Sequence, residues 1–377
     1  MKTILLTGGV GFLGSRLALK FINSGWAVLF WARNKGSESV EERITKSLGF
    51  WDPNYTRSQI QQEEVNVDIT KPLPKIKLKD INVIVHCAAS ISFRGQEEND
   101  FLERENILKI NFGGTKNVLD FALEFGIPLH YISTAYVAGD REGKIFEDEL
   151  DCGQKFHNPY EESKFLAEKM LRENMGRLPI AVHRPSIIVG DSVTGQTSTF
   201  TGFYGVYRIF HLLKKRMTAE KGGDDFSLPI NLFCNPASES NLVPVDFVAD
   251  TIFALVTKGE SAGKTFHITN ESPPNFGELT EKTLKIMRVK DFFLFDVENP
   301  SFVPGYKDKI AKAMERIVKN EWEPYFPYIS RRRVFDCRNA RAILGDAFKA
   351  PQITEDLLKK LLDYATDKNF GREKEER

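Results

Sequence analysis

The sequence predicts an α/β protein with a doubly wound parallel Rossmann sheet and a smaller, mainly helical C-terminal substrate-binding region. Short apolar runs alternate with amphipathic segments in the first part of the chain, which is typical of repeated β-α-β units. This alternation is interrupted at residues 194–239, and the C-terminal part shows mostly helical patterns. We therefore expect residues 1–190, completed by residues 241–270, to form the sheet domain, and residues 191–240 and 271–377 to form the second region.

The composition is ordinary for a globular protein of 377 residues, with 41% hydrophobic and 28% charged residues. The 52 Lys and Arg residues balance the 52 Asp and Glu residues, so we assign no nucleic-acid partner. No apolar run reaches the length of a membrane span, and the N-terminus lacks the pattern of a signal peptide. We therefore expect a cytoplasmic protein.

The cysteines and histidines indicate neither disulfides nor a metal site. Cys87, Cys152, Cys234 and Cys337 are far apart and show no paired spacing, so we expect reduced thiols, with Cys87 inside the core. The six histidines include no pair four residues apart, and we expect no bound metal.

The first apolar run ends in a glycine-rich turn, and residues 12–23 then show helical periodicity. Glycines allow the backbone to turn tightly and approach a pyrophosphate, which the N–H groups at the start of the helix stabilise. Glycine-rich turns also form for steric reasons alone, but the later motifs favour a dinucleotide. The predicted cofactor contacts here are Thr7, Gly8, Gly11, Phe12, Leu13 and Gly14.

A second apolar run, residues 26–31, ends in a basic segment. An acidic residue at this position accepts hydrogen bonds from the adenosine ribose, whereas a basic residue suits a 2′-phosphate. Here the residue is Arg33, whose guanidinium can bind phosphate through two hydrogen bonds, and Lys35 and Arg43 follow nearby. We therefore expect NADPH rather than NADH; the alternative is that Arg33 is a solvated surface residue.

The next elements are two strands and a helix. Residues 64–67 are expected to form a short strand, which is followed by Asp68, whose side chain can reach an adenine amino group. Residues 83–90 are expected to form a buried strand that turns from large apolar residues into small ones, which leave room for a cofactor. His86 is expected to be a hydrogen-bonded core histidine rather than a catalyst. Residues 97–110 are charged and lead into a helix over residues 111–124. The predicted cofactor contacts from the two strand ends are Asp68, Ile69, Ala88 and Ala89.

The next candidate site residues carry hydroxyl groups and a lysine ammonium. A strand over residues 128–132 ends in Ser133 and Thr134, at the edge where open α/β sheets bind ligands. Tyr160 and Lys164, four residues apart, face the same side of a helix. Hydride transfer to a carbonyl develops an oxyanion, to which Tyr160 and Thr134 can supply a proton and a hydrogen bond. We expect the ammonium of Lys164 to lower the pKa of Tyr160 from its usual value of about 10, and to hold the nicotinamide ribose.

Five features occur in this order along the chain: the glycine loop, Asn111, Thr134, Tyr160 and Lys164. Together they resemble the motifs of the extended short-chain dehydrogenase/reductase superfamily. Three segments are similar to its thioester-reductase and fatty acyl-CoA reductase branch, the male-sterility-type NAD-binding proteins: residues 86–93, 132–139 and 183–190. The resemblance implies that Asn111 helps to order a proton-relay water and that Ser133 supports Thr134 or the cofactor. It also assigns Pro185 and Ser186 to the cofactor site.

The resemblance implies an NADPH-dependent reductase of an apolar, fatty acyl thioester or of the derived aldehyde, with free acyl-CoA or a separate carrier protein as the partner. A ketone/alcohol oxidoreductase acting on a hydrophobic molecule is the main alternative. A nucleotide-sugar dehydratase or epimerase is disfavoured, because Ala135 and Tyr136 stand where dehydratases have an acidic pair and Arg33 stands where epimerases have an acidic residue. A non-catalytic NADPH-binding protein is the third alternative.

The second region contains features with competing interpretations. Residues 322–328, rich in aromatic residues and proline, are expected to form a lid over the substrate. Arg331, Arg332 and Arg333 are either a solvated face or a phosphate site. A stripe at helical spacing predicts a core-facing helix, with a wall of an acyl-chain pocket and a membrane-surface face as alternatives; it consists of Phe203, Val206, Tyr207, Phe210 and Leu213. The other elements expected are a strand-end loop and helix at 241–250, a strand at 265–269, helices at 307–320 and 354–365, and a frayed end at 371–377.

Overall fold

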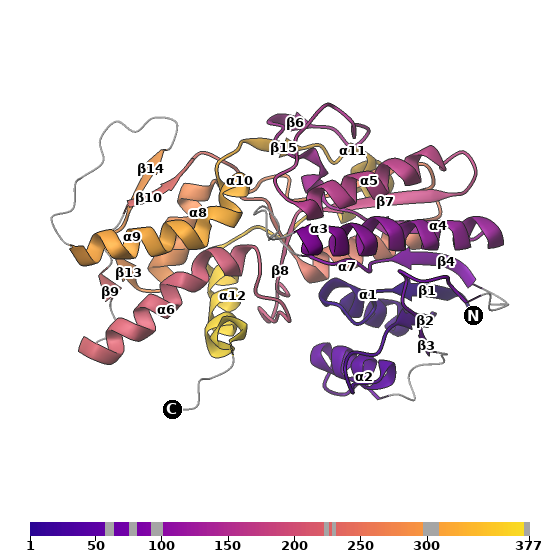
Figure 1. Cartoon of the computed structure of the whole chain (residues 1–377), viewed down its shortest axis with the longest axis horizontal. Helices are drawn as coiled ribbons and strands as arrows, with labels where there is room; N and C mark the ends of the chain where they lie inside the picture. The colour runs from indigo at the N-terminus through magenta and orange to yellow at the C-terminus, as the bar shows by residue number, and fades with distance from the viewer. Residues whose placement is uncertain are drawn as a thin grey trace.

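The computed structural model describes residues 1–56, 64–74, 81–91, 101–221, 226–227, 231–296 and 309–372. Its centre is a sheet of seven parallel strands in the order β12-β7-β5-β4-β1-β2-β3 (Figure 1). The strands are β1 (Thr3–Thr7), β2 (Ala27–Ala32), β3 (Glu64–Asn66), β4 (Ile81–His86), β5 (Leu129–Ile132), β7 (Ile180–Pro185) and β12 (Thr265–Ile268). The predicted fold class, a doubly wound parallel sheet with a mainly helical second region, is confirmed.

The chain enters the sheet in its middle. From β1 it proceeds outward to β2 and β3, and it then returns past β1 to β4, β5, β7 and β12. The reversal between β1 and β4 opens a crevice at the C-terminal edge of the sheet, where doubly wound folds bind ligands. The strands predicted from apolar runs are present, but β4 ends at His86, so the small residues that follow it form a loop.

Helices cover both faces of the sheet. Along β1, Ile4 and Leu6 point into one hydrophobic core and Leu5 into the other, because successive side chains of a strand alternate between faces. Both faces are therefore apolar, which explains why the strands are continuous apolar runs in the sequence. The first core also contains side chains of α1 (Phe12–Asn23), α2 (Val40–Trp51) and α7 (Val245–Lys258), and the second those of α4 (Gly114–Phe125) and α5 (Pro159–Glu173).

The helix predicted to begin at residue 111 begins earlier. α3 (Phe101–Leu108) continues through a π-helical turn, η3 (Lys109–Gly113), into α4, so Asn111 lies inside a helical segment. Much of α3 is exposed, and its charged face obscured the apolar periodicity in the sequence. Residues 92–100, which include part of the charged segment and the end of the first reductase-like motif, lie outside the described residues.

The helices of the second region lie beside the sheet domain (Figure 1) and enclose a third hydrophobic core. Amphipathic helices bury their apolar stripes against one another there: α6 (Phe203–Lys221), α8 (Phe276–Ile286), α9 (Lys309–Trp322) and α12 (Glu355–Asp367). Short parallel pairs accompany them: β8 (Ile187–Val189) with β11 (Leu242–Pro244), β9 (Phe226–Ser227) with β13 (Val289–Lys290), and β10 (Asn231–Cys234) with β14 (Phe293–Asp296). Residues 307, 308 and 373–377, parts of the predicted helix and frayed end, lie outside the described residues.

The C-terminal part returns to the sheet domain. β15 (Arg333–Phe335) pairs with β6 (Gly143–Ile145), and α11 (Arg338–Leu344) follows it. Ala340 and Phe348 belong to the first core. These residues, which we assigned to the second region, therefore pack on the sheet domain, and the rest of the predicted division stays a prediction. In the described ranges, every helix is too short or too polar to span a lipid bilayer.

Candidate active site and cofactor cleft

A cavity of about 890 Å³ lies between the C-terminal edge of the sheet and the second region. Its walls come from the glycine loop, the loops after β2, β4 and β5, and α5, α6, α8 and α10 (Phe326–Ile329). All predicted site residues except Thr7 and Asn111 line it. They are Gly8, Gly11, Phe12, Leu13, Gly14, Arg33, Asp68, Ile69, Ala88, Ala89, Ser133, Thr134, Tyr160, Lys164, Pro185 and Ser186.

The glycine loop requires glycine at two positions. Gly8 has a φ of +70°, and a Cβ there would lie 2.6 Å from the backbone nitrogen of Ala88. A Cβ at Gly14 would lie 2.1 Å from the carbonyl oxygen of Gly8. α1 starts directly after Gly11 and has no side-chain cap, so a bound phosphate can accept hydrogen bonds from its first N–H groups. The loop therefore fits the pyrophosphate of a dinucleotide.

Thr7 lies beneath this loop, outside the cavity lining. Its Oγ1 lies 2.6 Å from Nδ1 of His86 and accepts a hydrogen bond from the backbone N–H of Ala88 at 3.2 Å. Nε2 of His86 lies 2.9 Å from Oγ1 of Thr115. Burial, and to a smaller extent the charge of Lys164, lowers the pKa of His86 to about 3. His86 is thus a neutral, hydrogen-bonded residue that fixes the end of β4.

Basic side chains gather at the end of the cavity beyond β2. Arg33 is 60% exposed, and its Nη1 lies 3.9 Å from Oδ2 of Asp68. Arg43 donates a hydrogen bond to the carbonyl oxygen of Arg33. Lys35 and Lys46 also line this end. These cations can neutralise a phosphate on an adenosine ribose.

Thr134, Tyr160 and Lys164 converge in the middle of the cavity. Oγ1 of Thr134 caps the short helix η4 (Ala135–Ala138) by accepting a backbone N–H at 3.2 Å. The Thr134 hydroxyl also forms a hydrogen bond with the Tyr160 hydroxyl. Lys164, one helical turn after Tyr160, donates a hydrogen bond from Nζ to the carbonyl oxygen of Ile132 at 2.7 Å.

The electrostatics of this group differ from the expected pattern. Burial raises the pKa of Tyr160, and the hydrogen bond with Thr134 only partly opposes this. Our expectation that Lys164 lowers the pKa of Tyr160 is wrong for this arrangement, because Nζ of Lys164 is directed at the Ile132 carbonyl and lies 4.7 Å from the centre of the Tyr131 ring. Burial lowers the pKa of Lys164 to about 8. Tyr160 therefore stays protonated at neutral pH and can donate its proton.

Asn111 occupies the π-helical turn η3, a feature that often marks functional sites. Its Oδ1 accepts a hydrogen bond from the backbone N–H of Ser90 at 2.7 Å. Its Nδ2 donates to the carbonyl oxygen of Ser90 at 3.0 Å and to Oγ of Ser163 at 2.9 Å. Asn111 thus connects the loop after β4 to α5 behind Tyr160, and both hydrogens of its amide are already used.

The other half of the cavity is apolar. Of the predicted stripe, Phe203, Val206 and Tyr207 line the cavity, whereas Phe210 and Leu213 pack inside the third core. The core-facing and pocket-wall interpretations therefore each hold for part of the stripe, and the membrane-facing one is wrong because all five side chains are buried. Sequence reasoning missed other lining residues, among them four from distant segments with ordinary core patterns: Leu242, Phe276, Leu279 and Ile329.

The predicted lid contributes Tyr325 and Tyr328 to the cavity wall. The hydroxyl of Tyr328 donates a hydrogen bond to Oε1 of Glu161 at 2.6 Å and accepts one from Nδ2 of Asn158 at 2.8 Å. Its ring meets the ring of Tyr136 edge to face at 4.9 Å. Glu161 and Asn158 belong to the start of α5, so the lid is fastened to the helical turn that carries Tyr160.

The arginine run is not a uniform surface. Arg333 is buried and donates hydrogen bonds to the carbonyl oxygens of Arg141 at 3.0 Å and Gly139 at 2.8 Å, so it holds the returning chain rather than a phosphate. Cys87 also differs from expectation: it is half-buried and lines the cavity, and burial raises its pKa to about 12, which keeps the thiol protonated.

Comparison with known proteins agrees with this geometry. The family model described as male sterility protein, an NAD-binding family, matches residues 6–252. Carboxylic acid reductase of Mycobacterium marinum is 25% identical over 78% of this chain and 27% of that protein. Fatty acyl-CoA reductase 1 of Gallus gallus is 25% identical over 67% of this chain and 54% of that protein. The chain spans less than two thirds of the length of either relative.

Two solved structures share the whole fold. The terminal R domain from the myxalamid PKS-NRPS biosynthetic pathway superposes with a TM-score of 0.73 and 25% identity over 98% of this chain and 92% of that chain. A thiolation-reductase di-domain from an archaeal non-ribosomal peptide synthetase superposes with a TM-score of 0.75, covering 98% of this chain and 76% of that chain, and its identity of 19% supports the fold alone.

Proposed function

Because the chain belongs to the male sterility protein family of NAD-binding oxidoreductases, we propose that it is an NADPH-dependent reductase of apolar, fatty acyl thioesters or of the derived aldehydes. One observation carries this proposal. A single cavity joins a basic end, the Thr134–Tyr160–Lys164 group and an apolar chamber. A phosphorylated dinucleotide suits the first, hydride transfer to a carbonyl suits the second, and an acyl chain suits the third.

The chain's own residues define how the cofactor would be held. The glycine loop and the start of α1 would bind the pyrophosphate, Arg33 with Lys35 and Arg43 the 2′-phosphate, and Lys164 the nicotinamide ribose. The cofactor, when bound, supplies the hydride. Residues 1–190 and 241–270 would form most of this half, and the second region would enclose the acyl chain.

Tyr160 and Thr134 would act on the substrate carbonyl. As the carbonyl carbon gains a hydride, its oxygen becomes an oxyanion that the protonated Tyr160 neutralises and the Thr134 hydroxyl stabilises. In a thioester, the hemithioacetal formed in this way then collapses: the C–S bond breaks, the departing sulfur takes up the proton of the hydroxyl group, and an aldehyde and a free thiol remain. A second hydride would give the alcohol. The thiol would belong to coenzyme A or to a carrier protein.

A ketone/alcohol oxidoreductase is the second candidate, because the same hydroxyl groups would serve a ketone in this apolar chamber. Epimerases also share the fold: a UDP-glucuronic acid 4-epimerase from Bacillus cereus superposes with a TM-score of 0.64 at 19% identity. The aromatic wall of Phe203, Tyr207 and Phe276 favours an acyl chain over a sugar nucleotide.

The test is NADPH consumption by the purified protein with a long-chain acyl-CoA, with free thiol and aldehyde or alcohol measured in the same sample. Thiol and reduced product in equal amounts support the thioester reductase. Turnover of a long-chain ketone without acyl-CoA reduction would support the oxidoreductase instead. Cofactor binding without turnover of any carbonyl, including carrier-bound acyl groups, would contradict both.

A further inference from the structure

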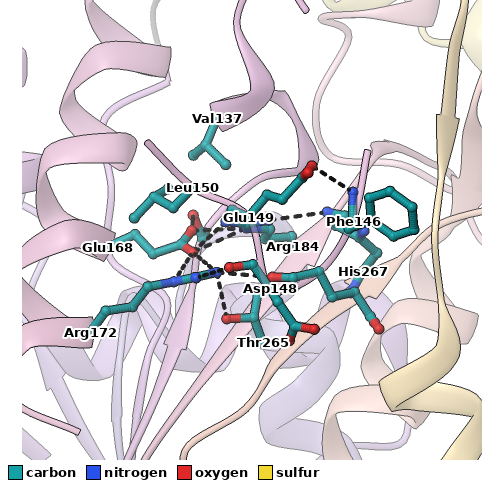
Figure 2. Close-up of polar contacts among 12 residues, drawn as sticks. Val137, Phe146, Asp148, Glu149, Leu150, Glu168, Arg172, Arg184, Thr265 and His267 are labelled. Atoms are coloured by element: carbon teal, nitrogen blue, oxygen red, sulfur yellow. Dashed lines mark hydrogen bonds and ion pairs between the residues drawn. The ribbon is translucent and has the colours of Figure 1, made fainter. Parts of the chain in front are cut away.

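Glu168 is a fully buried carboxylate that forms ion pairs with two arginines, Arg172 and Arg184 (Figure 2). Nη2 of Arg184 lies 2.6 Å from its Oε1, and Nε of Arg184 lies 3.1 Å from each of its oxygens. Nε of Arg172 donates to Oε1 at 3.0 Å. Burial acts to raise the pKa of Glu168, but the charge and hydrogen bonds of Arg184 act to lower it. The net pKa lies below its usual value, so the carboxylate stays ionised.

The two guanidinium groups are themselves fixed by neighbouring segments. Arg184 donates to the carbonyl oxygen of Glu149 at 2.8 Å, and its Nη1 lies 3.3 Å from Nε2 of His267. Arg172 donates to Oγ1 of Thr265 at 2.9 Å and to two backbone carbonyls. Buried ion pairs add little net stability compared with apolar side chains of similar volume. Stability alone therefore does not explain this cluster.

The cluster reaches the active site through a serine. Oγ of Ser133 donates a hydrogen bond to Oε2 of Glu168 at 2.9 Å, and Ser133 directly precedes Thr134 at the end of β5. On α5, Tyr160, Lys164 and Glu168 are each four residues apart and share one face. The same carboxylate is therefore connected to both sides of the Thr134–Tyr160 hydrogen bond.

We propose that Glu168 and Arg184 are positioning residues that hold the end of β5 against α5 and so keep Thr134 in hydrogen-bonding register with Tyr160. Arg184 extends this anchor to the end of β7, directly before Pro185. The proposal rests on the proposed function, because it takes Thr134 and Tyr160 to act on the substrate. It adds a role for side chains that do not touch the cavity.

The carboxylate also acts on the charge of Lys164. The groups that face Lys164 are Tyr160 and Glu168 on α5, Tyr131 on β5, and His86 and Cys87 at the end of β4. Burial keeps the tyrosines, the histidine and the thiol neutral at neutral pH. Burial lowers the pKa of Lys164, and Cys87 and then Glu168 oppose this by raising it. Among these described groups, Glu168 is the one that is ionised at neutral pH.

The experiment compares Glu168→Gln and Ser133→Ala with Arg172→Met as the matched control, which removes an arginine of the cluster on the side away from Ser133. Steady-state kcat and KM for acyl-CoA reduction are measured between about pH 6 and pH 9. The pKa of Lys164 is measured directly by NMR of protein with 13C-labelled lysine, its signal being assigned by its loss in Lys164→Met.

We expect Glu168→Gln to lower kcat roughly 100-fold with a smaller change in KM, since small displacements of reacting groups cost about that much. It should also shift the Lys164 pKa and the alkaline limb of the kcat profile to lower pH, which a merely structural loss would not do. Ser133→Ala should lower kcat without moving the Lys164 pKa. Arg172→Met should retain the wild-type kcat and the wild-type pKa of Lys164.

Wild-type kcat and an unchanged alkaline limb in Glu168→Gln would overturn the proposal. A loss of kcat in Arg172→Met equal to that in Glu168→Gln would also overturn it. If Glu168→Gln does not fold, unchanged kcat in Ser133→Ala overturns it. If the wild-type protein reduces no carbonyl substrate, the proposed function fails, and an unchanged Lys164 pKa in Glu168→Gln then decides separately against the action of Glu168 on Lys164.

Discussion

At the scale of single residues, the state of Tyr160 is set by its surroundings rather than by a nearby cation. Its phenol is buried, hydrogen-bonded to Thr134 and held protonated, whereas the Lys164 ammonium is directed at a backbone carbonyl. A protonated phenol at this position is a proton donor for reduction. Under the proposed function, Tyr160 would have to lose this proton before it could act in the reverse reaction.

Replacing Tyr160 by Phe removes this donor and leaves the ring in place. We expect kcat for acyl-CoA reduction to fall by roughly 100- to 10,000-fold, the range for loss of a general acid, while the Kd for NADPH stays near the wild-type value. Stopped-flow turnover and NADPH fluorescence titration measure the two quantities. A fully active Tyr160→Phe protein would remove Tyr160 from its assigned role.

Arg33 tests the choice of cofactor. Arg33→Asp replaces a group that can bind a 2′-phosphate by one that can accept hydrogen bonds from a ribose. Because hydrogen bonds to charged groups contribute about 1.5–3 kcal/mol, the ratio of kcat/KM for NADPH over NADH should fall roughly 10- to 100-fold. Lys116→Asp, at an exposed position of α4 that does not belong to the cavity lining, is the control for a general change of charge. An unchanged ratio in Arg33→Asp would place the phosphate elsewhere.

Lys164 makes stability depend on pH. Its pKa is about 8 in the folded protein against 10.5 for the free side chain, so between these values the unfolded state binds the extra proton. The free energy of unfolding therefore rises with pH across that window, by about 3 kcal/mol at most. Below pH 8 the folded protein bears the full cost of burying the charged ammonium. Denaturant unfolding of wild type and Lys164→Met from pH 7 to 10 measures it. A constant difference between the two proteins would contradict the prediction.

At the scale of elements, the glycine loop and α5 show what local sequence determines. The apolar run, the glycines and the start of α1 are adjacent in sequence, so their geometry was predictable, and α1 spans the expected residues 12–23. The spacing of four between Tyr160 and Lys164 likewise places both on one face of α5. The hydrogen bonds of Asn111 were not predictable, because a π-helical turn has no signature in the apolar pattern.

Gly14→Ala tests the loop. Its Cβ would lie 2.1 Å from the carbonyl oxygen of Gly8, so the backbone must shift, and we expect NADPH affinity to fall at least tenfold together with a lower Tm. Gly49→Ala is the matched control, since it lies inside α2 with no atom within 4 Å of the new Cβ. That change should raise the free energy of unfolding by about 0.5–1 kcal/mol. Equal NADPH affinity in both variants would contradict the assignment of the loop.

At the scale of the whole molecule, the substrate half of the cavity is assembled from segments far apart in the chain. Phe203, Leu242, Phe276 and Tyr328 meet there. The sequence patterns predicted a lid for residues 322–328 and, as an alternative, a pocket wall for Phe203, whereas they did not indicate a site at Leu242 or Phe276. Local periodicity shows that such residues are buried, but it does not show which distant partner buries them. The residues that line the cavity beside the glycine loop could therefore be predicted one by one, whereas the lining of the apolar half could be predicted only as a region.

Tyr328 joins the two halves. Tyr328→Phe removes its hydrogen bonds with Glu161 and Asn158 and leaves a buried carboxylate with one partner fewer. We expect a loss of about 1–3 kcal/mol in stability and a several-fold rise in KM for acyl-CoA with kcat reduced less. Tyr364→Phe, on α12 and outside the cavity lining, is the control and should change neither. An unchanged KM and unfolding midpoint in Tyr328→Phe would show that the lid is held by other contacts.

The return of the C-terminal stretch to the sheet domain has an evolutionary consequence. Because β15 pairs with β6 and Phe348 completes the first core, the two parts share one interleaved chain rather than meeting at a single joint. A recombination event that exchanged only the segment after residue 270 would carry away part of the nucleotide domain's own interior. We therefore expect relatives to change their substrate range by point substitutions in the apolar half of the cavity. An exchange of whole segments between relatives should succeed only where the exchanged segment keeps the returning stretch together with the sheet on which it packs.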